Sequence, residues 1–385
     1  MEPISHLKMP RAVWSGAGAL EQLPQLLAAA GAKRVAVFAD KGVVGAGLLA
    51  RPLALLEAQS AAYTVLEDLP PEPTYAQAQQ AVDACKALRP DLILAVGGGS
   101  VLDTAKLASI LLTDAYGVKE LLARPGLAQK CCPTVLVPTT AGTGSEATPN
   151  AIVAVPEQEV KVGIVNDAMI ADYVLMDPAM IRSLPRKIAA ATGVDALCHA
   201  IECYTSNKAN PISDTFALQA LDMILNNIVA ACDDPGALAA KSAMQLASFY
   251  AGVAITASGT TAVHALSYPL GGKYHIAHGV SNAMLLAPVM RFNAPACGER
   301  LAAAYDRCCF GDAGLSTAEK AEALLRRLEE IVAHLDIPTS LAAFGVPAED
   351  LETLVAAGLQ VTRLLNNNRR PVTAADARAL YRQIL

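Results

Sequence analysis

A change of pattern near residue 180 constrains the fold more than any other feature of this sequence. Before it, short β-rich runs alternate with helical stretches such as Tyr75–Leu88; these runs are Val35–Ala39, Leu92–Val96 and Thr134–Val137. From Arg186 onwards, Ala-, Leu- and Met-rich segments with helical periodicity dominate and β-rich runs almost vanish. The first pattern predicts an α/β, Rossmann-like domain with a parallel sheet and flanking helices. The second predicts an all-α, helical C-terminal domain.

The length of the chain agrees with two domains. A chain of 385 residues is too long for one hydrophobic core. With 53% of its residues hydrophobic and 17% charged, it can bury two. Pro178 and Pro185 bracket a short connection. We therefore expect an α/β domain over residues 1–182 and a helical domain over residues 183–385.

Charge and cysteine placement limit the expected partners. The net charge is −6 and no Lys/Arg run is present, which argues against a nucleic-acid partner. No uninterrupted apolar run approaches the roughly 20 residues that cross a bilayer, so no membrane partner is expected, and the start of the chain lacks a secretory signal pattern. The nine cysteines form no CxxC pair, which favours the reduced cytoplasm. A small-molecule substrate and a homo-oligomer such as a dimer are expected.

Four titratable residues have the composition of a metal site. Asp195 and His199 are four apart in an apolar helical stretch and so share a helix face. His264 and His278 follow, separated by the turn-forming segment Pro269 to Gly272. One Asp and three His suit Fe(II), Zn(II), Ni or Co better than Mg or Ca. A satisfied core hydrogen bond within the Asp/His pair, or a capping role for either later histidine, is the alternative.

A glycine-rich segment lies between a predicted strand and a predicted helix. Gly97, Gly98, Gly99 and Ser100 would let backbone N–H groups approach a pyrophosphate, whose charge a helix N-terminus favours. The segment lacks the G-x-G-x-x-G pattern. Ser100 and Asp103 also have the spacing of a capping box, so part of the signal indicates only a well-started helix.

A second loop follows another predicted strand and carries hydroxyl groups. Thr139, Thr140, Thr143 and Ser145 lie beside two glycines, which suits contact with phosphates and a nicotinamide ring. An ordinary polar turn is the alternative interpretation.

Asp40 ends the predicted strand VAVFAD. A carboxylate there is placed to accept both hydroxyls of an adenosine ribose and to repel a 2′-phosphate, which favours NAD(H) over NADP(H). A surface acid at a strand end is the alternative.

The segments GGGSVLDTAK, PTTAGTGSE, TGVDALCHAIE and VHALSYPLGGKYHIAHG together resemble the iron-containing (group III) alcohol dehydrogenases over nearly the whole chain. The resemblance implies a cleft that holds NAD and a metal ion, Fe(II) or else Zn(II). It implies that the metal ligands are Asp195, His199, His264 and His278, and that Asn150 lines the substrate end. It implies cofactor contacts from Asp40, Gly97 to Ser100, Asp103, Thr139, Thr140, Thr143 and Lys161.

One position departs from that family. Many members have VHAMAH where this chain reads VHALSY, so Tyr268 replaces a histidine thought to help move a proton. Tyr268 can still donate a hydrogen bond, and His275 is a candidate for the relay. Both are alternatively packing residues.

The resemblance implies an NAD-dependent and metal-dependent alcohol dehydrogenase or aldehyde reductase. The metal would lower the pKa of a bound hydroxyl, and the cofactor would accept the hydride. Alternatives are a maleylacetate reductase, a glycerol dehydrogenase-type enzyme, a dehydroquinate-synthase-like lyase, or a protein using the metal only as a staple. Lys273 and His275 hint at an aldehyde that bears a carboxylate, although a loop lysine is usually solvated.

Overall fold

The computed structural model describes residues 4–308 and 314–385. The chain forms two compact units, Lys8–Leu184 and Pro185–Leu385, and residues 4–7 belong to the second. The sequence placed the boundary two residues earlier and assigned the whole N-terminus to the first domain.

The first unit is built on a parallel sheet of six strands. They are β1 (Ala12–Ser15), β2 (Arg34–Phe38), β3 (Ala62–Leu66), β4 (Leu92–Gly97), β5 (Thr134–Pro138) and β8 (Tyr173–Met176). Their order across the sheet is β1-β8-β5-β4-β2-β3, and every pairing is parallel. The predicted parallel sheet with flanking helices is confirmed.

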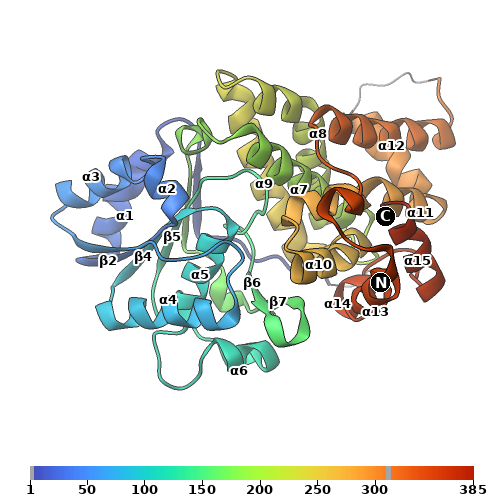
Figure 1. Ribbon diagram of the computed structural model, residues 1–385. Coiled ribbons are helices and arrows are strands. Elements are labelled where there is room, and N and C mark those ends of the chain that lie inside the picture. The colour runs from blue at the N-terminus through green and yellow to red at the C-terminus, as the bar shows by residue number, and fades with distance from the viewer. Residues whose placement is uncertain (1–3, 309–313) are drawn as a thin grey trace. The chain divides into compact units, whose positions relative to one another are not determined.

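Helices cover both faces of this sheet (Figure 1). On one face, α1 (Leu23–Ala30) and α3 (Ala50–Ala58) pack their leucines on Val35 and Val37 of β2 and on neighbouring strand residues. On the other lie α4 (Tyr75–Leu88) and α5 (Gly99–Ile110). The central strands are buried on both faces, which explains why they read as unbroken apolar runs. The short helices α2 (Lys41–Gly45) and α6 (Val118–Ala123) complete this part.

The strand order changes direction at β2. From β2 the chain adds β3 on one side and then places β4 on the other. Ligands of open parallel sheets bind at such a switch point, outside the carboxyl ends of the strands. The ends of β2, β4 and β5 are therefore where a dinucleotide site is expected.

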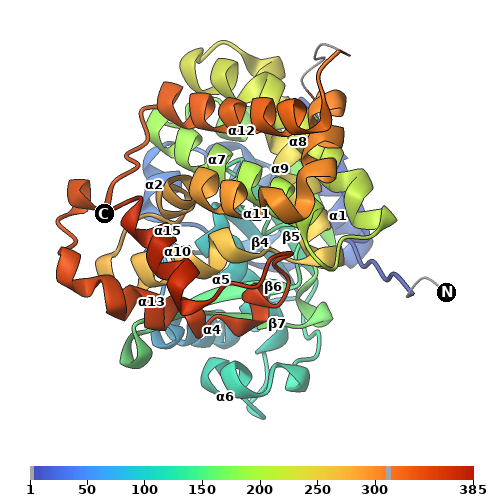
Figure 2. The same cartoon turned by 90° about the vertical axis from the view of Figure 1, so that its right-hand side faces the viewer.

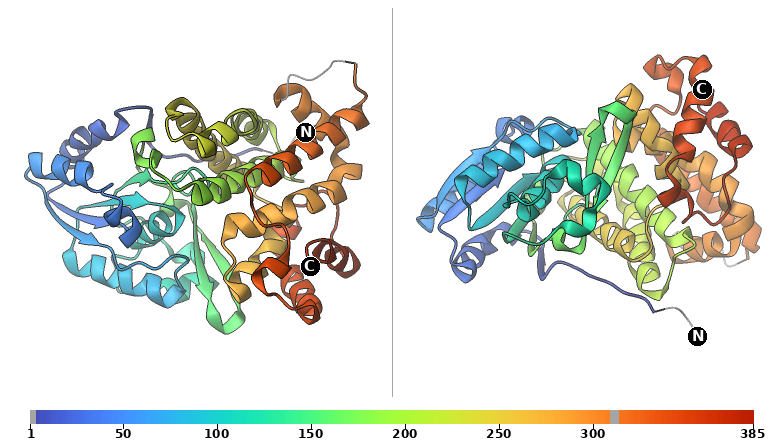
Figure 3. Two further views of the ribbon diagram at one scale, coloured as in Figure 1. Left: turned by 45° about the horizontal axis from the view of Figure 1, so that its top comes forward. Right: turned by 90° about the horizontal axis from the view of Figure 1, so that it is seen from below.

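A two-stranded antiparallel hairpin, β6 (Asn150–Val155) with β7 (Val160–Val165), stands apart from the main sheet (Figure 3). This hairpin was not among the predicted strands, although VKVGIV alternates in the manner of a half-buried strand.

The second unit is helical, as predicted. Its helices are α7 (Arg186–Thr205), α8 (Pro211–Asp233), α9 (Leu238–Ser258), α10 (Ala262–Tyr274), α11 (His278–Cys308), α12 (Thr317–His334), α13 (Leu351–Leu359), α14 (Thr362–Leu365) and α15 (Ala374–Arg382). α7, α8 and α9 pack on one another, and α12 runs along α11 (Figure 2). By length and composition α8 would suffice to cross a membrane, a test that core helices of globular domains also pass.

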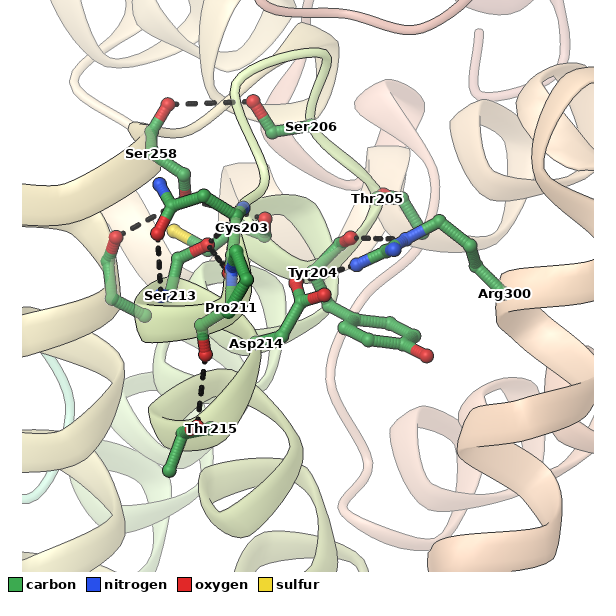
Figure 4. A network of polar contacts seen from close by, with 12 residues as sticks. Cys203, Tyr204, Thr205, Ser206, Pro211, Ser213, Asp214, Thr215, Ser258 and Arg300 are labelled. Atoms are coloured by element: carbon green, nitrogen blue, oxygen red, sulfur yellow. Dashed lines mark hydrogen bonds and ion pairs between the residues drawn. The ribbon is translucent and has the colours of Figure 1, made fainter. Parts of the chain in front are cut away.

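A polar network holds the C-terminal end of α7 (Figure 4). Arg300 of α11 donates to the Tyr204 carbonyl oxygen at 2.8 Å and to the Asp214 carboxylate of α8 at 2.5 Å. The Ser258 hydroxyl donates to the Cys203 carbonyl oxygen at 3.2 Å. Three helices thus fix the end of α7, which matters because α7 carries two of the candidate metal ligands.

Candidate metal centre and cofactor site

α7 presents three polar side chains on one buried face. Asp195 Oδ1 lies 3.7 Å from His199 Nε2, as their spacing of four residues predicts. Glu202, one further turn along, is fully buried. Two candidate ligands and a second carboxylate therefore come from one rigid helix.

His264 lies in the first turns of α10, and the expected turn between it and His278 is displaced. Pro269 to Gly272 belong to the helix rather than to a turn. A proline inside a helix loses one backbone hydrogen bond, but every residue from Ala262 to Gly271 is buried, and this packing offsets the loss. The chain reverses instead at His275, whose φ of 54° is in the left-handed region.

Gly279 allows α11 to begin against the backbone of α7. A Cβ atom at Gly279 would lie 2.0 Å from the Ala191 carbonyl oxygen. No residue with a side chain fits at this distance, so the position requires glycine. The preceding residue, His278, is thereby brought to Asp195, with 3.6 Å between His278 Nε2 and Asp195 Oδ1.

The four predicted ligands converge. One donor atom from each of Asp195, His199, His264 and His278 lies within 4.8 Å of all the others. The Asp195 Oδ1 atom is 3.5 Å from His264 Nε2. Ligand atoms of a tetrahedral complex with bonds of about 2.1 Å are about 3.4 Å apart. The arrangement therefore fits a transition-metal ion with little movement.

Charge at the centre of this group also suits a cation. Burial alone would raise the pKa of Asp195, but the facing histidines hold that pKa well below its usual range. Burial opposes protonation of His264, yet Glu202 and Asp195 raise the pKa of His264 to about 9. Both shifts mean that the buried carboxylates stabilise positive charge at this point. A divalent ion supplies that charge, and the residues present fit it.

Glu202, which the sequence analysis missed, orients His264. Its Oε2 contacts His264 Nδ1, while its Oε1 accepts from the backbone N–H groups of Thr261 at 3.0 Å and Val263 at 2.8 Å. Burial alone would raise the pKa of Glu202, but His264 and the Thr261 hydroxyl lower it, so the carboxylate is ionised. His264 therefore keeps its proton on Nδ1 and presents Nε2 to the ion. The signal was available, since Asp195, His199 and Glu202 are spaced along one helix face.

The two predicted cofactor loops pack together at the carboxyl ends of β4 and β5. A Cβ atom at Gly98 would lie 3.4 Å from Thr140 Cγ2, and one at Gly99 would lie 2.8 Å from Thr143 Cγ2. The Thr139 N–H donates to the Gly97 carbonyl oxygen at 2.9 Å. Of Gly98 and Gly99, only Gly99 is too close to its neighbour for a Cβ atom to fit without a shift. α5 begins there with the N–H groups of its first turn directed outward.

The predicted capping box at the start of α5 is wrong. Gly98 is the N-cap, and Ser100 lies inside the helix, where its hydroxyl accepts the Glu72 N–H at 3.0 Å. Asp103 turns into the protein, accepting the Ile152 N–H at 2.9 Å and pairing with Lys106 at 2.9 Å. The helix begins at a glycine N-cap without a side-chain cap. The Asp103 carboxylate is therefore free of a capping role and binds the backbone of the β6–β7 hairpin at Ile152.

Two further predicted cofactor residues have partners within the first unit. Asp40 follows β2 and caps α2, its Oδ1 accepting the Val43 N–H at 2.8 Å. Lys161 of β7 pairs with Glu72 at 2.7 Å. Asp40 lies at the switch point where a ribose is expected. The charge of Lys161 is already balanced by Glu72.

Comparison with known proteins decides the family. The family model described as iron-containing alcohol dehydrogenase matches residues 10–178, and that of the C-terminal region of the Fe-containing alcohol dehydrogenase family matches residues 189–385. The chain belongs to the iron-containing alcohol dehydrogenase family. The resemblance seen in the sequence is thus confirmed.

Relatives of this iron-containing alcohol dehydrogenase match over nearly its whole length. Long-chain-alcohol dehydrogenase 1 of Geobacillus thermodenitrificans is 37% identical over 98% of this chain and 94% of its own. The NAD-dependent methanol dehydrogenase of Bacillus methanolicus is 30% identical over 98% of this chain and 99% of its own. A solved 1,3-propanediol oxidoreductase superposes with a TM-score of 0.95 at 29% identity and covers 100% of both chains.

The two candidate relay residues of this alcohol dehydrogenase differ in their surroundings. Tyr268 is buried one turn beyond His264, and its ring centroid lies 6.0 Å from that of His278. His275 is exposed at the C-terminal end of α10, and it is not in the group of converging donors found among the described residues. The structure therefore brings the Tyr268 ring against that of a candidate ligand.

Lys273 and Asn150 complete the predicted set. Lys273 lies in the last turn of α10, not in a loop, and pairs with Asp350 at 3.0 Å. Asn150 begins β6, and its carbonyl oxygen accepts from the buried Lys106 ammonium. Lys273 was predicted to favour a substrate that bears a carboxylate. Its charge is balanced by Asp350 within the protein, which argues against that prediction.

Proposed function

We propose that this enzyme oxidises an uncharged primary alcohol with NAD⁺, and reduces the aldehyde in reverse, at an Fe(II) ion held by Asp195, His199, His264 and His278. The observation that carries the proposal is the convergence of these four donors on a buried point whose surroundings favour positive charge. Zn(II) has the same ligand preferences and is the second choice of metal.

The ion, when bound, supplies the Lewis acidity that lowers the pKa of the alcohol hydroxyl. The protein's own groups prepare the place for it. Glu202 fixes the orientation of His264, and Gly279 permits the approach of His278. Tyr268, buried beside His278, excludes water from that side of the ring. Such prearranged groups need no reorganisation during the reaction.

The loops of the first unit suit NAD. The N-terminus of α5, with Gly97 to Ser100 before and within its first turn, offers N–H groups to a pyrophosphate. Thr139, Thr140 and Thr143 line the adjoining turn with hydroxyl groups. Asp40 is placed to accept the ribose hydroxyls. We assign Asp103 and Lys161 supporting roles, because both are held by ion pairs within this unit.

The substrate class is inferred from two observations. The relatives reported above are named for methanol, a long-chain alcohol and 1,3-propanediol, and both methanol and 1,3-propanediol carry a primary hydroxyl. In this chain Lys273, the cation that the sequence placed near the cluster, is paired with Asp350. A substrate without a carboxylate is therefore favoured, with Asn150 contributing at the substrate end.

The competing activities make different demands. A maleylacetate reductase without a metal has no need of four converging donors, and a glycerol dehydrogenase would prefer the triol. A dehydroquinate-synthase-like lyase reoxidises its NADH internally and gives no net absorbance change. A metal used only as a staple would leave the glycine and threonine loops without a role.

The composition of the chain also supports a proposal about its partners and its compartment. A net charge of −6 does not favour a phosphate backbone. The cysteines described as free include buried Cys85, Cys198 and Cys203, which is compatible with a reducing cytoplasm. We further propose a homo-oligomer such as a dimer, which sedimentation analysis would test.

The proposed function is tested by following NADH formation by the metal-loaded enzyme. The substrates are methanol, 1-propanol, 1-octanol, 2-propanol, glycerol and a 4-carbon hydroxy acid, each with Fe(II) or Zn(II). We expect primary monoalcohols to give the highest kcat/KM. A preference for the hydroxy acid or for glycerol would contradict the proposed substrate, and the absence of any net NADH formation would contradict the reaction.

A further inference from the structure

The connection between α14 and α15, residues 366–370, reaches all three helices associated with the candidate metal ligands. Its first attachment is to the end of α7, the helix that supplies two of those ligands. The Arg369 guanidinium donates to the Ser206 carbonyl oxygen at 2.9 Å. The Asn207 N–H donates to the Asn367 carbonyl oxygen at 2.7 Å. The connection is therefore fixed to the chain that leaves α7.

A second attachment joins the same connection to α11. The buried amides of Asn368 and Asn293 pair reciprocally, with both hydrogen bonds at 2.8 Å. Arg370 donates to the Phe292 carbonyl oxygen at 3.0 Å. Asn293 lies about four turns beyond His278 on α11, so these bonds hold the connection at a distance from the ligands.

The third attachment is to the turn between α9 and α10, and the Asn367 side chain makes it. Asn367 is buried, and its Nδ2 donates to the Thr260 carbonyl oxygen at 2.9 Å. Gly259 has a φ of 76°, and a Cβ atom there would lie 2.9 Å from Asn367 Nδ2. The turn is thus packed closely against this amide, and glycine permits the approach.

The turn that Asn367 holds is next to the groups that hold Glu202. Thr261 follows Thr260, and its backbone N–H and hydroxyl donate to Glu202 Oε1 at 3.0 and 2.7 Å. The other oxygen of Glu202 contacts His264 Nδ1. A shift of the turn would therefore move the carboxylate that orients a candidate ligand.

The Asn367 amide is oriented by this one contact. Its Oδ1 is buried and meets no hydrogen-bond donor in the described part of the chain, which is unfavourable for a carbonyl oxygen. Exchanging the two ends of the amide would set Oδ1 against the Thr260 carbonyl oxygen, and two acceptors repel each other. We propose that Asn367 is a positioning residue of the metal centre, which fixes the turn before α10 and acts on His264 through Glu202.

This inference rests on the metal centre of the proposed function, and its test measures metal affinity rather than turnover. The full-length enzyme is stripped with a chelator, and its affinity for Zn(II) is measured by competition with a chromogenic chelator. Asn367→Leu has a similar volume but no donor for Thr260. We expect it to bind Zn(II) about fivefold more weakly, the effect of one hydrogen bond.

Asn368→Leu is the matched control. Asn368 is the neighbouring buried amide of the same connection, and its side chain bonds to Asn293 and not to the turn before α10. Its loss should destabilise the fold in urea but leave the Zn(II) affinity equal to that of the parent. Asn367→Asp serves if the leucine variant does not fold, because it keeps the shape of the side chain. At neutral pH its carboxylate cannot donate, so the affinity should fall at least as far.

A double variant shows whether Asn367 acts through Glu202. Residues that act along one path give effects that do not multiply. When Glu202→Gln is already present, adding Asn367→Leu should weaken Zn(II) binding by less than about twofold. A side chain that only braces the fold would not produce this dependence.

Three results would overturn the inference while leaving the proposed function intact. They are a parental Zn(II) affinity in Asn367→Leu and Asn367→Asp, an equal loss of affinity in Asn368→Leu, and the full fivefold loss on top of Glu202→Gln. If the parent itself bound no Zn(II), the metal centre would fail, and the proposed function with it.

Discussion

Glu202 contacts the Nδ1 edge of His264 from the same face of α7 that carries Asp195 and His199. One helix thus supplies two candidate ligands and the carboxylate that orients a third. The relationship ties the geometry of α10 to that of α7, because the Glu202 carboxylate also accepts the Thr261 and Val263 N–H groups at the start of α10.

We expect Glu202→Gln to weaken metal binding about 10- to 100-fold, as loss of a carboxylate partner of a ligating histidine does. The glutamine side chain keeps an oxygen that can accept from the α10 N–H groups. It has no negative charge, so its hydrogen bond to His264 Nδ1–H is weaker. The metal affinity is measured by competition with a chelator. Glu329→Gln, an exposed carboxylate paired with Arg291, is the control and should bind normally. Equal affinities in both variants would refute the role of Glu202.

Glu146 in the second cofactor loop makes stability depend on pH. Burial raises its pKa to about 7, against about 4.5 in the unfolded chain. A carboxyl group with a raised folded pKa contributes its full stability below pH 4.5 and loses it as the pH rises through 7. The free energy of unfolding of the parent should therefore fall between pH 5 and pH 8. We expect this fall, measured by urea denaturation, to be smaller in Glu146→Gln. An identical pH dependence in the parent and the variant would contradict this.

Asp40 is expected to exclude NADP⁺ through its charge. Asp40→Asn keeps an oxygen that can accept the Val43 N–H and so preserves the cap of α2, whereas Asp40→Gly removes both charge and cap. Both variants should narrow the preference for NAD⁺, measured as the ratio of kcat/KM values for the two cofactors. A parent enzyme that already prefers NADP⁺ would show that the assignment is wrong.

Paired pH–rate profiles of variants distinguish whether His275 or Tyr268 takes part in proton transfer. If the relay uses His275, then His275→Asn should lower kcat and flatten the profile, while Tyr268→Phe should do much less. Asparagine is the choice at 275 because the φ of 54° strains most other residues. An unchanged profile for His275→Asn would remove it from the mechanism, and a changed profile for Tyr268→Phe would favour the residue that packs beside His278.

The sequence predicted those parts of the site that depend on local spacing. Asp195 and His199 share a face because a helix relates residues four apart, and the glycine loop follows a strand because its apolar run ends at Gly97. The parallel sheet and the helical second half follow equally from periodicity.

The features that the sequence left out depend on contacts between distant segments. Pro269 reads locally as a turn, but burial of the surrounding residues keeps it in α10. Ser100 and Asp103 have capping spacing, yet Asp103 instead binds the backbone of Ile152, 49 positions away. Glu202 acquires its role only when the start of α10 reaches α7.

The metal content and turnover of His264→Ala test the central claim most directly. His264 supplies one of four converging donors and is the ligand that Glu202 orients. The account predicts that the purified, folded variant retains little Fe(II) by elemental analysis and forms almost no NADH from a primary alcohol, while the parent does both. Full metal content with normal NADH formation in His264→Ala would contradict it.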